Sequence, residues 1–159
     1  GYFSKSAFVW FRKTDDPARA ASLALTEATK APDTFKKWGD SSYGLSLSVS
    51  PIQQVGKRAQ VVVIAVRNTR HSDAHLVPKQ PEIYLETRDG KGRPIQIESV
   101  KKLAIESTVT DDVIPGGSVR YFALAYEMPI MGARQRLRVA VGHVTAADEP
   151  ATSNLTSNR

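Results

Sequence analysis

The chain has 159 residues, which is enough for one domain whose buried core needs no disulfide or metal to hold it together. It contains no cysteine, so disulfides, zinc–thiolate sites and thiol catalysis are excluded. Its formal net charge of +6 favours contact with anionic surfaces, but Lys and Arg stand singly or in pairs, without the dense runs typical of nucleic-acid-binding or lipid-binding segments.

The first predicted element is a helix over Pro17–Lys30. Asp16 precedes Pro17, which gives an N-cap followed by proline at the first helical position. Pro32 ends the helix, and one further helical turn is expected in the segment that follows. The apolar stripe consists mainly of small residues at helical spacing, which suits close packing on a sheet: Ala18, Ala21, Ala24, Leu25 and Ala28. We expect residues 1–40 to form an N-terminal helical extension.

Beyond this extension, apolar residues recur at every second position, which is the period of a β-strand. The expected strands are Tyr43–Ser50, Ala59–Asn68, Pro81–Asp89, Pro94–Val100, Leu103–Val109, Val119–Glu127 and Arg134–Val144. The segment Ala59–Asn68 is β-branched on both faces, so it predicts a central strand covered on both sides. No connection after residue 40 is long enough for a crossover helix. We therefore expect a mainly β protein, an immunoglobulin-like antiparallel β-sandwich of about seven strands with an N-terminal α-helix. The sandwich is expected to cover residues 41–145, and residues 146–159 are expected to form a flexible C-terminal tail.

Three segments carry a resemblance to a known family: "VVVIAVRNT", "EIYLETRDGKG" and "VIPGGSVRYFALAYEMP". Together they are similar to the telokin-like, immunoglobulin-fold accessory domains of bacterial envelope proteins and lipoproteins, over roughly Tyr43 to Val144. Asn68, Pro115-Gly116 and Met128-Pro129 match the corners of that pattern. The resemblance implies a non-enzymatic binding or assembly module near a membrane, in the periplasm or another extracytoplasmic compartment, and it supplies no catalytic residues.

One strand suggests a binding face. If Met128–Ala133 is a hairpin connection, odd positions of Val119–Glu127 point into the core together with Leu137, Val139 and Val141. Even positions and the neighbouring arginines then share an outer face of aromatic, Leu and Arg residues, which are enriched at protein interfaces: Arg120, Phe122, Leu124, Tyr126, Arg134, Arg136 and Arg138. Ile130 and Met131 at the adjacent loop tip complete the predicted partner-binding set. The alternative is that the alanine-rich helix, or the apolar segment Ala7–Phe11, covers Phe122, Leu124 and Tyr126.

The same face offers a second interpretation, a single-stranded nucleic-acid binder that stacks bases on Phe122 and Tyr126. The dense basic groove of such proteins is missing, and Glu98, Glu106 and Glu127 dilute the positive charge, so a protein partner is preferred.

The segment "HSDAH" offers the one local metal-binding pattern. In an extended chain His71, Asp73 and His75 project to one side, and two imidazoles with a carboxylate suit a transition metal. This keeps a metal-binding protein or hydrolase open as an alternative, while a polar loop is the other interpretation. We expect His143 at the opposite end of the sandwich, about 25 Å away. The loops Thr69–Gln80 and Met128–Arg134 are expected at one common end.

The preferred prediction is a non-enzymatic protein-interaction or assembly module of a bacterial cell-envelope complex, with no catalytic residues and no cofactor. The apolar run Ala7–Phe11 is much shorter than the roughly 20 residues of a transmembrane helix and lacks the form of a signal peptide. Any membrane anchor is therefore expected upstream of Gly1.

Overall fold

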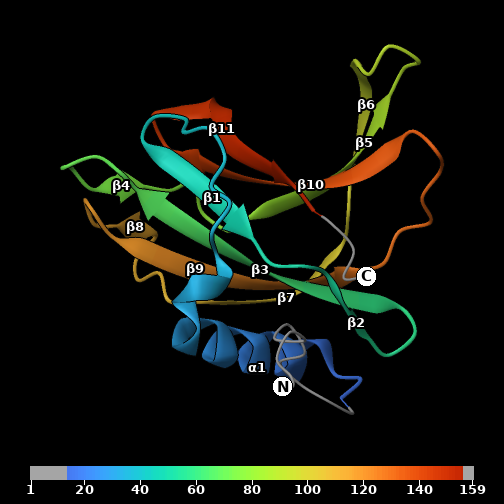
Figure 1. Cartoon of the computed structure of the whole chain (residues 1–159), viewed down its shortest axis with the longest axis horizontal. Coiled ribbons are helices and arrows are strands. Elements are labelled where there is room, and N and C mark those ends of the chain that lie inside the picture. Colours follow the sequence, from blue (N-terminus) through green and yellow to red (C-terminus); the bar gives the residue numbers. More distant parts are fainter. Residues whose placement is uncertain (1–13, 156–159) are drawn as a thin grey trace.

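A computed structural model describes residues 14–155 of the chain (Figure 1). The segment Ala7–Phe11 lies outside the described residues. The helix α1 spans Pro17–Lys30 and is followed by the short 3-10 turn η2 at Pro32–Thr34. Among the described residues, no helix is long and apolar enough to cross a bilayer.

The strands form two main antiparallel sheets. The larger sheet has the order β1-β3-β9-β7, with β2 also paired to β3, and its strands are β1 (Leu45–Val49), β2 (Gln53–Val55), β3 (Ala59–Asn68), β7 (Lys102–Ser107) and β9 (Val119–Glu127). The smaller sheet has the order β11-β10-β5-β6, and its strands are β5 (Glu82–Arg88), β6 (Pro94–Ser99), β10 (Gln135–His143) and β11 (Ala146–Asn154). A separate short pair joins β4 (Ala74–His75) to β8 (Val113–Ile114). The predicted β-sandwich with one helix is confirmed.

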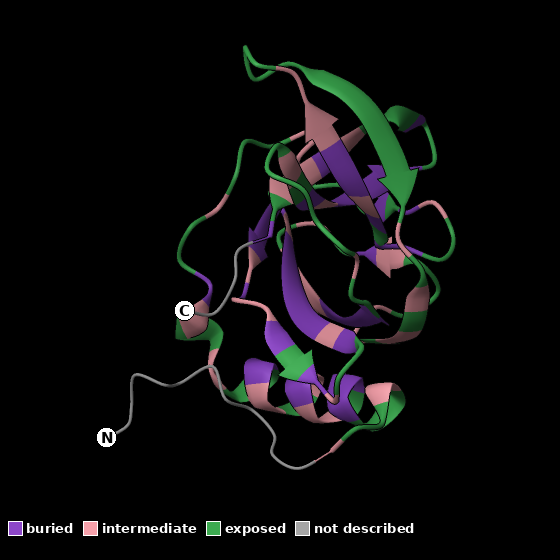
Figure 2. Ribbon diagram, turned by 90° about the vertical axis from the view of Figure 1, so that its right-hand side faces the viewer, coloured by how far each residue is buried: buried purple, intermediate pink, exposed green. Residues whose placement is uncertain are grey.

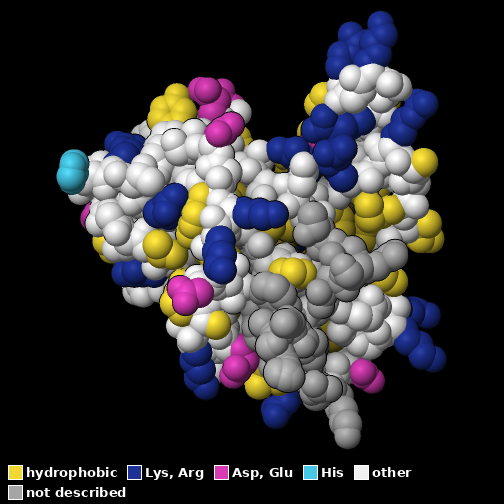
Figure 3. Space-filling view, in the orientation of Figure 1, with side chains coloured by type: hydrophobic (Ala, Val, Ile, Leu, Met, Phe, Trp, Pro, Cys, Tyr) yellow, Lys and Arg dark blue, Asp and Glu magenta, His cyan; other side chains and the backbone are white. Residues whose placement is uncertain are grey.

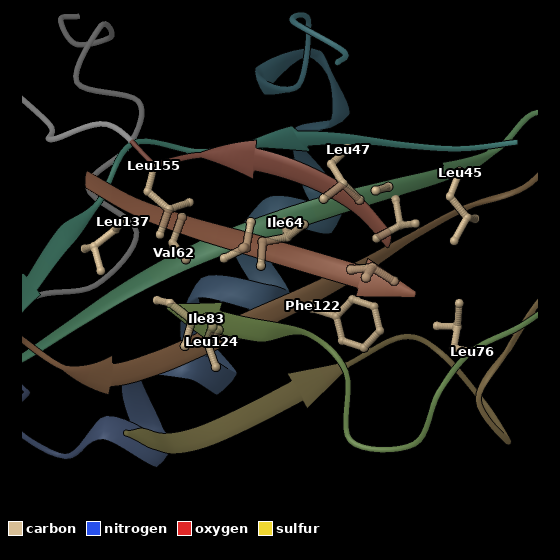
Figure 4. Close-up of a cluster of buried hydrophobic side chains, with 14 of the residues drawn as sticks. Leu45, Leu47, Val62, Ile64, Leu76, Ile83, Phe122, Leu124, Leu137 and Leu155 are labelled. Atoms are coloured by element: carbon tan, nitrogen blue, oxygen red, sulfur yellow. The ribbon is translucent and has the colours of Figure 1, made fainter. Parts of the chain in front are cut away.

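The main core lies between the two sheets (Figure 4). Its members are apolar side chains from both inner faces, among them Leu45, Leu47, Val62, Ile64, Leu76, Ile83, Phe122, Leu124, Leu137, Val139 and Val141. These residues are almost fully shielded from solvent. Removing this apolar surface from water is the main term that holds the sheets face to face.

The helix covers the other face of the larger sheet, as Figure 1 shows. Its N-cap is Asp16, whose Oδ1 accepts a hydrogen bond from the Ala18 amide at 3.1 Å, as predicted. The buried stripe of α1 consists only of alanines, namely Ala20, Ala21, Ala24 and Ala28. They pack against small residues of β3 and β9 such as Val63 and Ala123. Because the buried residues of α1 are all alanines, the helix backbone can approach the sheet closely.

β3 is therefore covered on both sides, which confirms the interpretation of its sequence. Val62 and Ile64 point into the core between the sheets, whereas Val61 and Val63 face the helix. All four side chains are fully buried. This arrangement explains why β-branched residues occupy both faces of the strand.

The predicted outer face of β9 is wrong. β9 and β10 are not a hairpin, because they belong to different sheets and Met128–Arg134 crosses between those sheets. The even residues Phe122, Leu124 and Tyr126 consequently face β10 across the core and are at most 4% exposed. Alternation within one strand cannot tell which of two buried faces meets the other sheet.

The alanine-rich helix does not cover those residues either. The odd residues Ala123 and Ala125 of β9 are the ones that face α1. With Phe122 and Tyr126 inside the core, the aromatic platform that stacking of nucleic-acid bases requires does not exist on this face.

The end of the chain also differs from the prediction. Ala146–Asn154 forms β11, an edge strand paired with β10, so residues 146–154 are not a loose tail. Polar side chains fix it in place: Arg138 donates to Asn154 Oδ1 at 2.8 Å and to Thr152 Oγ1 at 2.6 Å. The polar sequence of this strand gave little apolar alternation from which to predict it.

Two further placements are corrected by strand direction. β3 and β10 run the same way in the two sheets, so their C-terminal ends meet, and Val144 N donates to His75 O at 2.8 Å. His143 therefore lies beside the histidine loop, paired with Leu76, and not at the opposite end. Met128 N donates to Arg58 O at 2.8 Å at the start of β3, so Met128–Arg134 and Thr69–Gln80 lie at opposite ends.

Candidate protein-interaction surface

The β5–β6 hairpin projects from the body of the sandwich (Figures 1 and 2). β6 is the outermost strand of its sheet, and all six of its residues are exposed. Ile95 and Ile97 are 63% and 62% exposed, which is unusual for isoleucines placed two apart in a strand. Sequence alternation predicts this strand correctly but implies one buried face, whereas none of residues 14–155 covers either face.

The turn that joins β5 to β6 is organised around one carboxylate. Asp89 Oδ1 accepts hydrogen bonds from the amides of Lys91 at 2.8 Å and Arg93 at 2.9 Å, and Oδ2 lies 3.0 Å from Arg93 Nε. These bonds, above all the one from the Arg93 amide, lower the pKa of Asp89. Gly92 has a φ of +80°, a conformation that glycine adopts without strain. The hairpin tip is thus held in one shape.

A buried ion cluster supports the base of the hairpin. Glu86 is 5% exposed and accepts a 2.8 Å hydrogen bond from Arg88 Nε, while Arg138 Nε lies 3.8 Å from its other oxygen. Arg138 also donates hydrogen bonds to β11, so its guanidinium is used for contacts within the protein. A buried carboxylate with two cationic neighbours is compensated in charge. Of the predicted arginines on β10, Arg138 is therefore structural, whereas Arg136 is exposed.

The crossing connection lies against the same hairpin. Arg88 N donates to Arg134 O at 2.9 Å, and Gln135 Nε2 donates to Thr87 Oγ1 at 3.0 Å. A shallow cavity of about 300 Å³ lies between the hairpin turn and the connection, and the guanidinium of Arg134 lies beside Gly90. Ile130 is 97% exposed and Met131 is 45% exposed further along the connection. Both remain candidates for partner contact.

These residues define what we call the hairpin surface: Lys91, Arg93, Ile95 and Ile97 of the hairpin, and Ile130, Met131, Arg134 and Arg136 of the connection and the start of β10. Figure 3 shows Lys and Arg side chains gathered on the hairpin and around its base. The surface combines exposed apolar groups with cations. Sequence reasoning found the residues of the connection but missed Ile95 and Ile97, because their alternation matches that of a half-buried strand.

The histidine segment does not assemble a metal site. Among residues 14–155, no three His, Asp or Glu side chains are grouped closely enough to hold an ion. His71, Asp73 and His75 are all exposed, and Asp73 Oδ1 accepts a hydrogen bond from the Gly116 amide at 3.2 Å. This bond connects the loop to the Pro115–Gly116 corner. Such a structural role agrees with the interpretation of the segment as a polar loop.

Two further cavities lie away from the hairpin surface. One of about 320 Å³ lies beside the start of α1, and another of about 350 Å³ lies beside β7 at the open edge of the sandwich. In the second cavity Lys102 Nζ already donates to the carbonyl oxygens of Lys79 at 2.9 Å and Pro81 at 3.1 Å. Neither cavity, nor the one beside the hairpin, is lined by a histidine.

No family model and no curated protein matches the chain. Similar solved structures include the archaellum periplasmic stator protein FlaG from Sulfolobus acidocaldarius, at 12% identity and a TM-score of 0.37, covering 76% of this chain and 95% of that one. A β-sandwich protein from Clostridium difficile 630 has 10% identity and a TM-score of 0.42, covering 77% and 91%. A human ASH/PapD-like domain has 13% identity and a TM-score of 0.32, covering 76% and 87%. Similarity at this level assigns neither a family nor a function.

Proposed function

We propose that this chain is a non-enzymatic β-sandwich module that binds another protein through the hairpin surface. One observation carries the proposal: β6 is exposed along its whole length and presents Ile95 and Ile97 to solvent. Single exposed apolar residues are ordinary, but two in an edge strand that is paired on one side only, flanked by cations, match the composition of a protein interface. Proteins normally protect such an edge unless it has a partner.

The hydrogen bonding of the hairpin supports a binding role. Asp89 holds the tip, and Glu86 with its two arginines holds the base, so the hairpin is ordered before it meets a partner. Ordering a surface in advance lowers the entropy that is lost on association.

We further propose that the module works in a bacterial cell envelope, outside the cytoplasm. Support comes from the resemblance of its strand and corner motifs to envelope accessory domains. Fractionation of cells that make the natural protein tests this point. We expect the protein with the envelope or periplasmic fraction, and recovery with a cytoplasmic marker would contradict the proposal.

Site-specific photocrosslinking in the same cells tests the interaction itself. A photoreactive residue replaces Ile97 or Ile130, and a matched control replaces Thr26 on the exposed side of α1. We expect a common adduct from the two test positions, weakened by Arg134→Glu together with Arg136→Glu. The adduct partner is then purified and its binding reconstituted. Equal adducts from Thr26, or none from either test position, would overturn the interaction.

A further inference from the structure

We propose that β6 binds an extended acidic segment of its partner as an additional strand of the smaller sheet. This inference rests on the proposed function and adds the mode of binding and the chemistry of the partner. In strand addition, main-chain hydrogen bonds supply affinity and alternate side chains supply specificity.

The backbone of β6 has the required unpaired groups. Val100 N donates to Ile83 O at 3.1 Å, and the register sets Ser99 opposite Tyr84 and Ile97 opposite Glu86. In an antiparallel ladder every second pair is hydrogen-bonded, so Gln96 and Glu98 turn their main-chain groups toward β5. The N–H and C=O groups of Ile97 and Ser99 therefore point away from the sheet. No described strand lies on that side of β6.

Two other sheet edges are less open to a partner. β11 carries Asp148, Glu149 and Pro150, and charged residues and proline discourage strand pairing. β7 lies against α1, with Ala104 packed on the helical cluster. β6 has one central charge, Glu98. Its only proline, Pro94, is the first residue of the strand and so does not interrupt the edge. Of these three edge strands, β6 alone is exposed on both faces, which favours it as the place where a strand is added.

The side chains of β6 specify the partner. Ile95 and Ile97 offer apolar contacts at two alternate positions, while Arg93 and Lys101 are exposed at the two ends. A segment of about nine residues spans this distance at roughly 3.3 Å per residue. The matching segment carries β-branched or apolar residues at alternate central positions and a carboxylate at each end. The net charge of +6 also favours approach of an acidic partner.

A second copy of this chain matches less well. Pairing β6 with itself about Ile97 sets Arg93 of one copy directly opposite Lys101 of the other. Like charges directly opposite in a ladder are destabilising. Self-pairing is therefore the less favoured occupant of this edge, and the test below can detect it.

The test is a nuclear magnetic resonance titration of the full isotope-labelled chain with synthetic peptides. The probe is Glu-Thr-Val-Thr-Val-Thr-Val-Thr-Glu, and its matched control has Lys in place of both Glu residues. We expect the acidic probe to shift the amides of Ile97 and Ser99 at up to millimolar concentration, with the Lys control weaker by about tenfold. The decisive variants are Ser99→Pro, which removes an outward N–H without touching the β5 ladder, and Ser99→Ala, which keeps it. Binding should be lost in the first and kept in the second.

The outcomes separate this inference from the proposed function. No shift with any peptide, shifts away from β6, or equal affinity of the Ser99→Pro variant would overturn strand addition. Shifts of β6 that depend on protein concentration without peptide would indicate self-pairing and overturn the acidic partner. If strand addition fails while crosslinks from Ile97 and Ile130 persist, the proposed function stands with another binding mode. If those crosslinks are absent, the proposed function itself fails.

Discussion

Tyr126 places a hydroxyl in the apolar core between the two sheets. The residue is fully buried, its oxygen has no hydrogen-bond partner among residues 14–155, and burial raises its pKa. A buried polar group without a partner costs about 1–3 kcal/mol. We expect Tyr126→Phe to raise the free energy of unfolding by about 1 kcal/mol in urea denaturation, since it removes that cost and keeps the ring. Tyr121→Phe is the control, because Tyr121 is half-buried, and a loss of stability in Tyr126→Phe would contradict the account.

His143 gives the protein a pH-dependent stability. The residue is 4% exposed, and its pKa lies below the ordinary 6.5. The main cause is burial, which disfavours the charged ring, and the cationic Arg70 also lowers the pKa. A main-chain hydrogen bond with Tyr43 acts in the opposite direction. The folded state therefore binds this proton less readily than the unfolded state. Stability is complete above the unfolded pKa and is lost as pH falls through 6.5 toward the folded pKa.

Unfolding measured between about pH 7.5 and 5 checks this sign. We expect the free energy of unfolding to fall as the solution is acidified, and His143→Gln to reduce the slope. The exposed His75 serves as the control, and His75→Gln should keep the slope. A slope that is the same in His143→Gln and in the natural sequence would contradict the role of His143.

At the scale of single elements, the β5–β6 turn depends on Asp89. Asp89→Ala removes the acceptor for two main-chain amides and the ion pair with Arg93. We expect the hairpin tip to lose its fixed shape, so that trypsin cleaves after Lys91 several-fold faster. Limited proteolysis followed by mass spectrometry measures the rate, with Asp33→Ala as the control. An unchanged cleavage rate would show that the turn is held without this carboxylate.

The fit of α1 on the sheet makes a second prediction at this scale. Ala24 is fully buried between the helix and the larger sheet. Ala24→Leu forces extra volume into a closely packed interface, and such overpacking costs about 1–3 kcal/mol. The control Thr26→Leu adds a similar side chain on the exposed side and should leave stability nearly unchanged. Thermal unfolding distinguishes the two, and equal melting temperatures would contradict close packing.

For the whole molecule, local signals in the sequence were sufficient to predict elements but not their neighbours. The Asp16–Pro17 pair predicted the start of α1, and two-sided branching predicted the burial of β3. The sheet to which a strand belongs depends on contacts distant in sequence, and alternation is the same for either sheet. This is why alternation predicts the wrong outward face for β9 and the wrong end of the sandwich for His143.

The hairpin surface shows the same division. Their residue types predict partner contact for Ile130, Met131, Arg134 and Arg136, and the structure leaves all four exposed. The exposure of Ile95 and Ile97 could not be predicted, because it depends on whether another element packs on the strand. The sequence of the strand itself does not show this. Arg138 had the right type but is held by Glu86, a long-range pairing without a local signature.

The central position of β3 has a consequence for hydrogen exchange. Its amides, covered by a helix on one side and a second sheet on the other, can reach solvent only through global unfolding, so their exchange should report the full stability of the fold. The outward amides of Ile97 and Ser99 should exchange almost as fast as in an unfolded chain. One deuterium-labelling experiment therefore measures both the most and the least protected strands. Slower exchange at the amides of Ile97 and Ser99 alone would indicate that a strand has bound to β6.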